Sequence, residues 1–362
     1  MRSITLAILG LVTVISHAPH VDRIRNDQWH LRYLQAAEAH RHSRGDGVIV
    51  AVIDTGVDRH PDLTDNLLPG VDIDTTNDTG QHDVDSHGTG MAGLIAAHGL
   101  GPDTGALGIA PHAQVLPIRY QDLSNQGNSD RIARSIAWAV THGADVINIS
   151  GGGGPGEELR SAIDAAVRAD VVVVASAGNR PAVRGVTFPA AYDGVLAVGA
   201  VDRQGNHAEV SVSGKQIAIS APGVDIYSTS YKGLYRKGTG TSDAAAIVSG
   251  AVALVRSKYP ELSAPEVVHR LTATATDKGP PGRDEQYGYG VLNLVAALTA
   301  DVPPLGSATT ATATPDGPGP DNGGKGSSLA AWLAAAAAAA AATIATGIAW
   351  RRRQNRHRNP PA

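Results

Sequence analysis

Short apolar runs alternate with amphipathic stretches through the middle of this sequence. Five of the runs are rich in β-branched residues and lack polar–apolar alternation, which is the pattern of parallel strands buried on both faces. These predicted strands span residues 48–53, 114–119, 145–149, 171–175 and 195–201.

Helical periodicity fills the intervals between the runs and predicts helices over 88–98, 130–142, 157–169, 241–258 and 265–275. Ser263 and Glu266 form a capping-box pattern before the last helix, with Pro265 in its first turn. Alternating strands and helices predict an α/β fold: a doubly wound, mostly parallel sheet with helices on both faces. Ligands bind beyond the carboxyl ends of such strands, so functional residues are expected directly after them.

The N-terminal end has the pattern of a secretory signal peptide. Arg2 precedes an apolar run over residues 4–15, and the small residues Ser16 and Ala18 follow it. We therefore predict a signal peptide over residues 1–18, with a buried N-terminal helix as the alternative.

The C-terminal end has the pattern of a membrane anchor. Residues 301–328 are rich in Pro, Gly and Thr and predict an extended linker. Residues 329–350 carry no charge and are long enough for a transmembrane helix, although an alanine-rich helix in solution is the alternative. Residues 351–362 contain five arginines, which mark the cytoplasmic side. The expected location is the cell membrane, with one span, the body outside and the tail in the cytoplasm.

Composition limits the chemistry that the body can carry. The formal net charge of −4 over 362 residues argues against nucleic acid as a partner. The absence of cysteine excludes disulfides and thiolate zinc sites.

Three polar residues stand where the predicted sheet places functional side chains. Asp54 ends the first strand, His87 opens a helix, and Ser242 stands near the N-terminus of the helix over 241–258. That helix end favours negative charge, because its backbone N–H groups are unpaired. Taken singly, Asp54 can accept hydrogen bonds in a turn, His87 can be an ordinary histidine among the 14 in the chain, and Ser242 can cap a helix. Together, in the order Asp, His, Ser, they predict a catalytic triad.

Three sequence blocks resemble the signature blocks of subtilisin-like serine proteases. They are residues 53–56 (IDTG), 87–89 (HGT) and 240–242 (GTS), and the resemblance covers about residues 47–299. It implies a subtilase catalytic domain over 46–300: a serine endopeptidase that cleaves protein or peptide substrates through an acyl-enzyme and needs no cofactor.

Two further segments resemble binding elements of that family. Asn179, at the end of the segment 175–179 (ASAGN), matches the residue that donates to the oxyanion. The glycine-rich segment after the strand over 145–149 resembles the strand along which peptide substrates lie. The resemblance thus assigns substrate binding to Ser150, Gly151, Gly152 and Gly153.

Narrower features resemble the mycosins, membrane-anchored subtilases associated with type VII secretion in actinobacteria. They are the segment 27–31 (DQWHL), the Pro-rich linker, the C-terminal span and the basic tail. The resemblance implies a type VII secretion membrane complex as partner and an N-terminal extension, residues 19–45, packed along the catalytic domain. Trp29, Leu31 and Tyr33 supply apolar contacts from a helical stretch expected to end near His40. The lack of cysteine and the short linkers between the blocks depart from this subfamily.

Two residues after the serine depart from the wider family. Most subtilases have an apolar residue and, three residues later, a proline, where this chain has Asp243 and Ala246. A carboxylate beside the oxyanion opposes its charge, whereas one that points to solvent has little effect. A weakly active or inactive scaffold subunit of a secretion complex is therefore the alternative function. An α/β-hydrolase esterase is disfavoured, because Ala244 replaces a glycine of G-x-S-x-G and the triad order differs.

The stretch over residues 72–85 is acidic. Its carboxylates, at positions 72, 74, 78, 83 and 85, make a calcium site conceivable. They lack the spacing of a known calcium loop, so a solvated surface loop is favoured. His82 and His87 are not in an H-E-x-x-H helix, and we expect no metal site.

Overall fold

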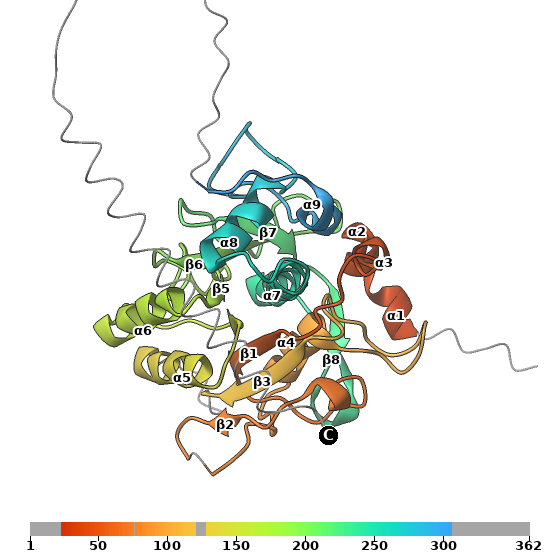
Figure 1. The fold of residues 1–362 in the computed structure, drawn as a ribbon, viewed down its shortest axis with the longest axis vertical. Helices are drawn as coiled ribbons and strands as arrows, with labels where there is room; N and C mark the ends of the chain where they lie inside the picture. The colour runs from red at the N-terminus through yellow and green to blue at the C-terminus, as the bar shows by residue number, and fades with distance from the viewer. Residues whose placement is uncertain (1–22, 76, 121–127, 306–362) are drawn as a thin grey trace, which may run out of the picture. The chain divides into compact units, whose positions relative to one another are not determined.

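The computed structural model describes residues 23–75, 77–120 and 128–305 (Figure 1). The predicted signal peptide, transmembrane helix and basic tail lie outside the described residues, as does the linker beyond Leu305. Within the described ranges, no helix is both long and apolar enough to cross a membrane.

A seven-stranded parallel sheet forms the centre of the body, in the order β2-β3-β1-β4-β5-β6-β7. The five predicted strands all lie in it: β1 (Ile49–Asp54), β3 (Gln114–Arg119), β4 (Val146–Ile149), β5 (Val172–Ser176) and β6 (Val195–Val201). The edge strands β2 (Val71–Asp72) and β7 (Ile219–Pro222) were not predicted, because two to four residues are too few for a readable pattern.

Helices cover both faces of the sheet (Figure 1). On one face, α5 (Ser129–Thr141) and α6 (Glu157–Arg168) pack against a core that includes Ala51 and Ile53 of β1. On the other, α4 (His87–Ala96) and α7 (Thr241–Lys258) pack against Val50 and Val52. Successive residues of one strand thus enter opposite cores, which is why the runs show no alternation. The predicted α/β fold with a mostly parallel sheet is confirmed.

The remaining elements are short, apart from α8 (Ala264–Ala273), which starts with the predicted capping box. An antiparallel hairpin of β8 (Ile226–Thr229) and β9 (Tyr235–Gly238) precedes α7. The described ranges also contain α9 (Leu294–Thr299) and the 3₁₀ turns η1 (Thr64–Asn66) and η2 (Tyr231–Gly233).

Helix α7 runs through the core, and every residue over 241–256 is buried. Its alanines let the helix backbone approach the sheet closely. Gly250 allows a similarly close approach to the loop before β3, because a Cβ added there would lie 2.7 Å from the Cβ of Ile109. Ser249 satisfies its hydroxyl by donating to the carbonyl oxygen of Ala245 and to Asn148. The small residues therefore fix the helix, and with it the position of its N-terminus.

The described part of the N-terminal extension forms three short helices, α1 (Arg23–Asp27), α2 (Trp29–Tyr33) and α3 (Ala36–Ala39), so the predicted helical stretch does end near His40 but is broken twice. The first break is at Gln28, whose side-chain amide bonds to the backbone of Leu107 and to the carbonyl oxygen of Tyr227. The second is at Gln35, which has a left-handed φ of 52°.

The extension is also tied to the body through its aromatic residues. The indole N–H of Trp29 donates to the carbonyl oxygen of Val224 at 3.1 Å, and Trp29 and Leu31 are buried in the core. Contacts with the body, rather than helix propensity, decide the shape of this segment.

His30 gives the extension a dependence on pH. Its ring is fully buried, and neither ring nitrogen has a hydrogen-bond partner among the described residues. Burial, with the nearby Arg32 cation, lowers the pKa of His30 from 6.5 to about 3. The folded state therefore binds fewer protons than the unfolded state between these values, so stability is lost as the pH falls from 6.5 towards 3.

We expect His30→Leu to remove this loss. The wild-type free energy of unfolding should fall relative to that of the variant by about 1.4 kcal/mol per pH unit below pH 6.5. Urea unfolding at about pH 7 and about pH 4.5 measures this difference in the free energy of unfolding. His82→Leu, at a side chain that is 70% exposed, is the control and should keep the wild-type slope. Equal slopes for wild type and His30→Leu would contradict the assignment.

Candidate active site

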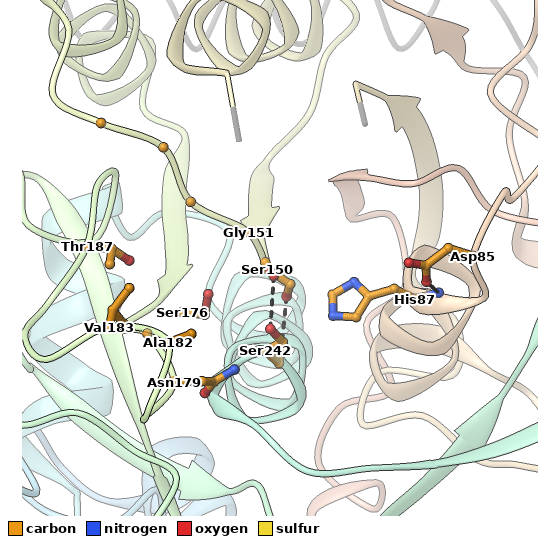
Figure 2. A pocket seen from close by; sticks show the side chains of 14 residues that line it. Asp85, His87, Ser150, Gly151, Ser176, Asn179, Ala182, Val183, Thr187 and Ser242 are labelled. Atoms are coloured by element: carbon orange, nitrogen blue, oxygen red, sulfur yellow. Dashed lines mark hydrogen bonds between the residues drawn. The ribbon is translucent and has the colours of Figure 1, made fainter. Parts of the chain in front are cut away.

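Strand and helix ends bring the three predicted triad residues together. Asp54 is the last residue of β1, His87 the first of α4, and Ser242 the second of α7. His87 and Ser242 line a cavity of about 570 Å³ (Figure 2). Asn179 and the segment 150–153 line the same cavity, so the predicted site residues from five segments of the chain meet at one place.

Asp54 holds the imidazole of His87. Its Oδ1 lies 2.8 Å from Nδ1 of His87 and also accepts the backbone N–H of Thr55. Burial alone lowers the pKa of His87, but the charge of the nearly inaccessible Asp54 and its hydrogen bond outweigh this effect and raise the pKa above its usual value. A proton on Nδ1 leaves Nε2 of the neutral ring as an acceptor on the other side.

The hydroxyl of Ser242 is hydrogen-bonded to Ser150, the residue directly after β4. It donates to the carbonyl oxygen of Ser150 at 2.9 Å, while the Ser150 hydroxyl donates to the carbonyl oxygen of Ser242 (Figure 2). Among the described residues there is no hydrogen bond between Ser242 and His87. Rotation about the Cα–Cβ bond of Ser242 is enough to redirect the hydroxyl, and such bonds often form only with substrate present.

The side-chain amide of Asn179 is oriented by Thr241. Its oxygen accepts the backbone N–H and the hydroxyl of Thr241, at 2.9 and 3.0 Å. The amide nitrogen is therefore left on the side of Ser242 (Figure 2). Gly240 gives it room, since a Cβ there would lie 2.9 Å from that nitrogen. Thr241 and Gly240, which the sequence presented only as members of a block, thus orient a free donor towards the cavity.

The glycine-rich segment forms one wall of the cavity. Ser150, Gly151, Gly152 and Gly153 all line it. The N–H of Gly153 already donates to the carbonyl oxygen of Phe188, at 2.9 Å. The N–H of Gly153 is therefore already engaged within the protein.

The buried carboxylate of Asp83 is a site residue that sequence reasoning missed. Its side chain accepts hydrogen bonds from the hydroxyl of Thr55 and from the N–H and hydroxyl of Thr89, at 2.5–2.8 Å. It also accepts the N–H of Ser86, whose φ of 76° turns the chain into α4. Thr55 follows Asp54, and Thr89 lies two residues after His87, so Asp83 fixes one triad segment against the other.

The expectation of a solvated acidic loop is therefore wrong at two positions. Asp83 is 2% exposed, and Asp72 is 8% exposed and paired with Arg119. The sequence places Asp83 four residues before His87, but nothing in the acidic stretch distinguishes it from the carboxylates around it. Over the described ranges, no group of three His, Asp or Glu side chains is arranged to hold a metal ion.

The structure excludes one of the two positions considered for Asp243 from the sequence. Its side chain does not point to solvent, because only 3% of it is exposed. It faces Arg236 of β9, with 3.8 Å between Oδ1 and Nη1. The charge next to the proposed nucleophile is thus accompanied by an opposite charge.

Comparison with known proteins gives consistent matches. The Subtilase family (Peptidase S8) profile matches residues 45–290. Subtilisin DY of Bacillus licheniformis is 40% identical over 259 residues, which are 70% of this chain and 92% of that protein. The structure of MycP1 from Mycobacterium smegmatis matches with a TM-score of 0.69 and 33% identity, over 80% of this chain and 88% of the other. The MycP3 protease of a type VII (ESX-3) secretion system matches with a TM-score of 0.67 and 36% identity, over 75% and 88%.

The network around Asp83 predicts a large structural effect of a small substitution. Asp83→Asn places an amide NH₂ among N–H and O–H donors, so buried donors lose their acceptor. We expect a loss of about 2–4 kcal/mol in the free energy of unfolding, measured by urea denaturation. Asp65→Asn, at a side chain that is 87% exposed, is the control and should change stability by about 0.5 kcal/mol or less. Equal effects of the two substitutions would refute the role of Asp83.

Proposed function

This chain belongs to the subtilase family of serine endopeptidases, and from that premise we propose that Asp54, His87 and Ser242 are its catalytic triad. The observation that carries the proposal is the hydrogen bond between Asp54 and His87 beside a cavity that also contains Ser242. The donor amide of Asn179 lines the same cavity.

In the proposed mechanism, substrate binding releases the Ser242 hydroxyl from Ser150. Nε2 of His87 takes the hydroxyl proton as Oγ attacks the peptide carbonyl carbon, and the C–N bond breaks as the proton passes to the leaving amine. Asp54 keeps the proton on Nδ1 and stabilises the imidazolium. In the second half, Nε2 of His87 takes a proton from water as the water oxygen attacks the acyl carbon. His87 then returns the proton to Oγ of Ser242 as the acyl–oxygen bond breaks and the carboxylic acid product leaves. The Asn179 amide and the Ser242 backbone N–H, which lies in the unpaired first turn of α7, hold the oxyanion.

An extended peptide fits the wall formed by Ser150, Gly151 and Gly152. Without bulky side chains in the way, their backbone groups can pair with a substrate strand. The hydrogen bond from Gly153 to Phe188 supports that wall from the other side.

Single substitutions in the triad should abolish turnover without unfolding the protein. We expect Ser242→Ala and His87→Ala to lower kcat by about 10⁶-fold and Asp54→Asn by about 10⁴-fold, magnitudes that are those of subtilisin itself and of the same Asp→Asn change in a Ser-His-Asp protease of unrelated fold. Hydrolysis of a chromogenic peptide measures the loss. Ser257→Ala, a serine substitution on the same helix, is the matched control and should keep wild-type kcat.

A fluorophosphonate probe separates an active enzyme from an inactive scaffold. It should label the wild-type chain and not Ser242→Ala. A folded wild-type chain without label would favour the scaffold subunit, and peptide cleavage that persists in Ser242→Ala would overturn the triad.

We further propose that the enzyme is anchored in the cell membrane and works with a type VII secretion membrane complex. The apolar segment 329–350 and the arginines after it support the anchor. The likeness to MycP1, which is described as an essential component of the type VII (ESX-1) secretion system, supports the partner. The two structures align with a TM-score of 0.69 and 34% sequence identity over 79% of this chain.

The proposed topology has a direct test. A reporter fused after Ala362 should be active only in the cytoplasm, because the basic tail stays inside. Protease added to intact spheroplasts should cut the linker over residues 301–328 and release the catalytic domain. A full-length chain that is recovered in the soluble fraction would contradict the anchor.

A further inference from the structure

A pair of opposite charges, the buried Asp243 and the partly buried Arg236, lies beside the proposed triad. We propose that Arg236 and Asp243 are positioning residues: as an ion pair they join the helix of His87 to the helix of Ser242 and balance each other's charge next to His87. The proposal rests on the proposed catalytic roles of His87 and Ser242.

Each member of the pair depends on the other. Asp243 directly follows Ser242 on α7, and the Arg236 guanidinium is its partner at 3.8 Å. Over the part of the chain that the structure describes, neither Nη1 of Arg236 nor Oδ1 of Asp243 has a hydrogen-bond partner. A single buried charge without a partner is strongly destabilising, so removal of either residue leaves the other in an unfavourable position.

Two glycines make room for the pair. A Cβ at Gly90 would lie 2.5 Å from Nη1 of Arg236, so the guanidinium lies directly over the backbone of α4. Gly90 comes three residues after His87, on the same side of the helix. A Cβ at Gly238 would lie 2.4 Å from Oδ1 of Asp243, so the β9 backbone lies over the carboxylate.

The hairpin that carries Arg236 is itself fixed to α4. The hydroxyls of Ser228 and Thr229, on β8, donate to the carbonyl oxygens of Gly90 and Thr89, both at 2.7 Å. Both hydroxyl residues are buried. Arg236 therefore keeps a constant position relative to α4, and its pairing with Asp243 passes that constraint to α7.

The pair also contributes opposite charges at His87. The charged groups that face His87 are Asp54 from β1, Asp85 from the preceding loop, Asp243 from α7 and Arg236 from β9. The Arg236 cation lowers the pKa of His87, whereas the Asp243 carboxylate raises it. Burial raises the pKa of Asp243 itself, and Arg236 opposes that rise and favours the ionised form. Loss of either Arg236 or Asp243 therefore leaves the effect of the other on the pKa of His87 uncompensated.

The test is the pH dependence of kcat/KM for peptide hydrolysis, whose acidic limb follows the ionisation of the free histidine. Asp243→Asn leaves Arg236 alone and should move the limb to lower pH by about 0.5–1 unit. Arg236→Gln leaves Asp243 alone and should move it to higher pH by a similar amount. The double variant should return close to wild type. Lys237→Gln, which removes the exposed neighbouring cation on β9, is the matched control and should not move the limb.

A second measurement does not depend on activity. The ring of His87 is titrated by NMR in the Ser242→Ala protein, with its signal identified by comparison with His87→Ala, and should show the same two opposite shifts. If Arg236→Gln does not fold, Arg236→Lys, which keeps the cation, should keep the wild-type limb, and Asp243→Asn should still shift it downwards. Reduced activity with an unmoved limb, or shifts in the same direction for both single variants, would overturn the proposal. Cleavage by Ser242→Ala would instead overturn the triad and leave the NMR result to decide on the pair.

Discussion

The alignment of the proposed active site depends on the hydrogen bonds accepted by Asp83. This carboxylate joins the residue after Asp54 to the first turn of the helix that begins with His87. The Thr55 hydroxyl completes the connection by accepting the N–H of Gly88. Because a carboxylate only accepts, and every group around it donates, the arrangement is favourable in a site that water does not reach. The bond between Asp54 and His87 can be short because the two backbones are already fixed around Asp83.

The serine is positioned by a different principle. Helix α7 is held by close packing of small residues against the sheet. Its N-terminus lies beside the residues that follow β4 and β5, because Ser242 bonds to Ser150 and Thr241 bonds to Gly178. Ser242 and Thr241 occupy the first turn, where backbone N–H groups are free, and Thr241 uses its own N–H and hydroxyl to orient Asn179. The imidazole of His87 and the proposed oxyanion donor are thus supported by polar networks, whereas the proposed nucleophile is supported by apolar packing.

The sequence predicted those parts whose signals are local and long enough to read. All five predicted strands and the helices longer than eight residues appear, to within two residues at each end. The breaks in the N-terminal helical stretch were not predicted, because the one at Gln28 is caused by backbone groups of Leu107 and Tyr227, far away in sequence. Asp83 was missed because burial of a carboxylate depends on donors from two other segments. The surroundings of Asp243 were equally inaccessible, since its partner lies on a four-residue strand without a recognisable pattern.

The pairing of Arg236 with Asp243 also restricts how this sequence can change over evolutionary time. Replacement of Asp243 by an apolar residue before Arg236 changes leaves a partly buried arginine without its partner. Replacement of Arg236 first leaves a buried carboxylate without its partner. The fitness effect of each substitution therefore depends on whether the other has already occurred, and the glycines at positions 90 and 238 remain under constraint for as long as the pair does. Positions 236 and 243 are therefore expected to change together rather than one at a time.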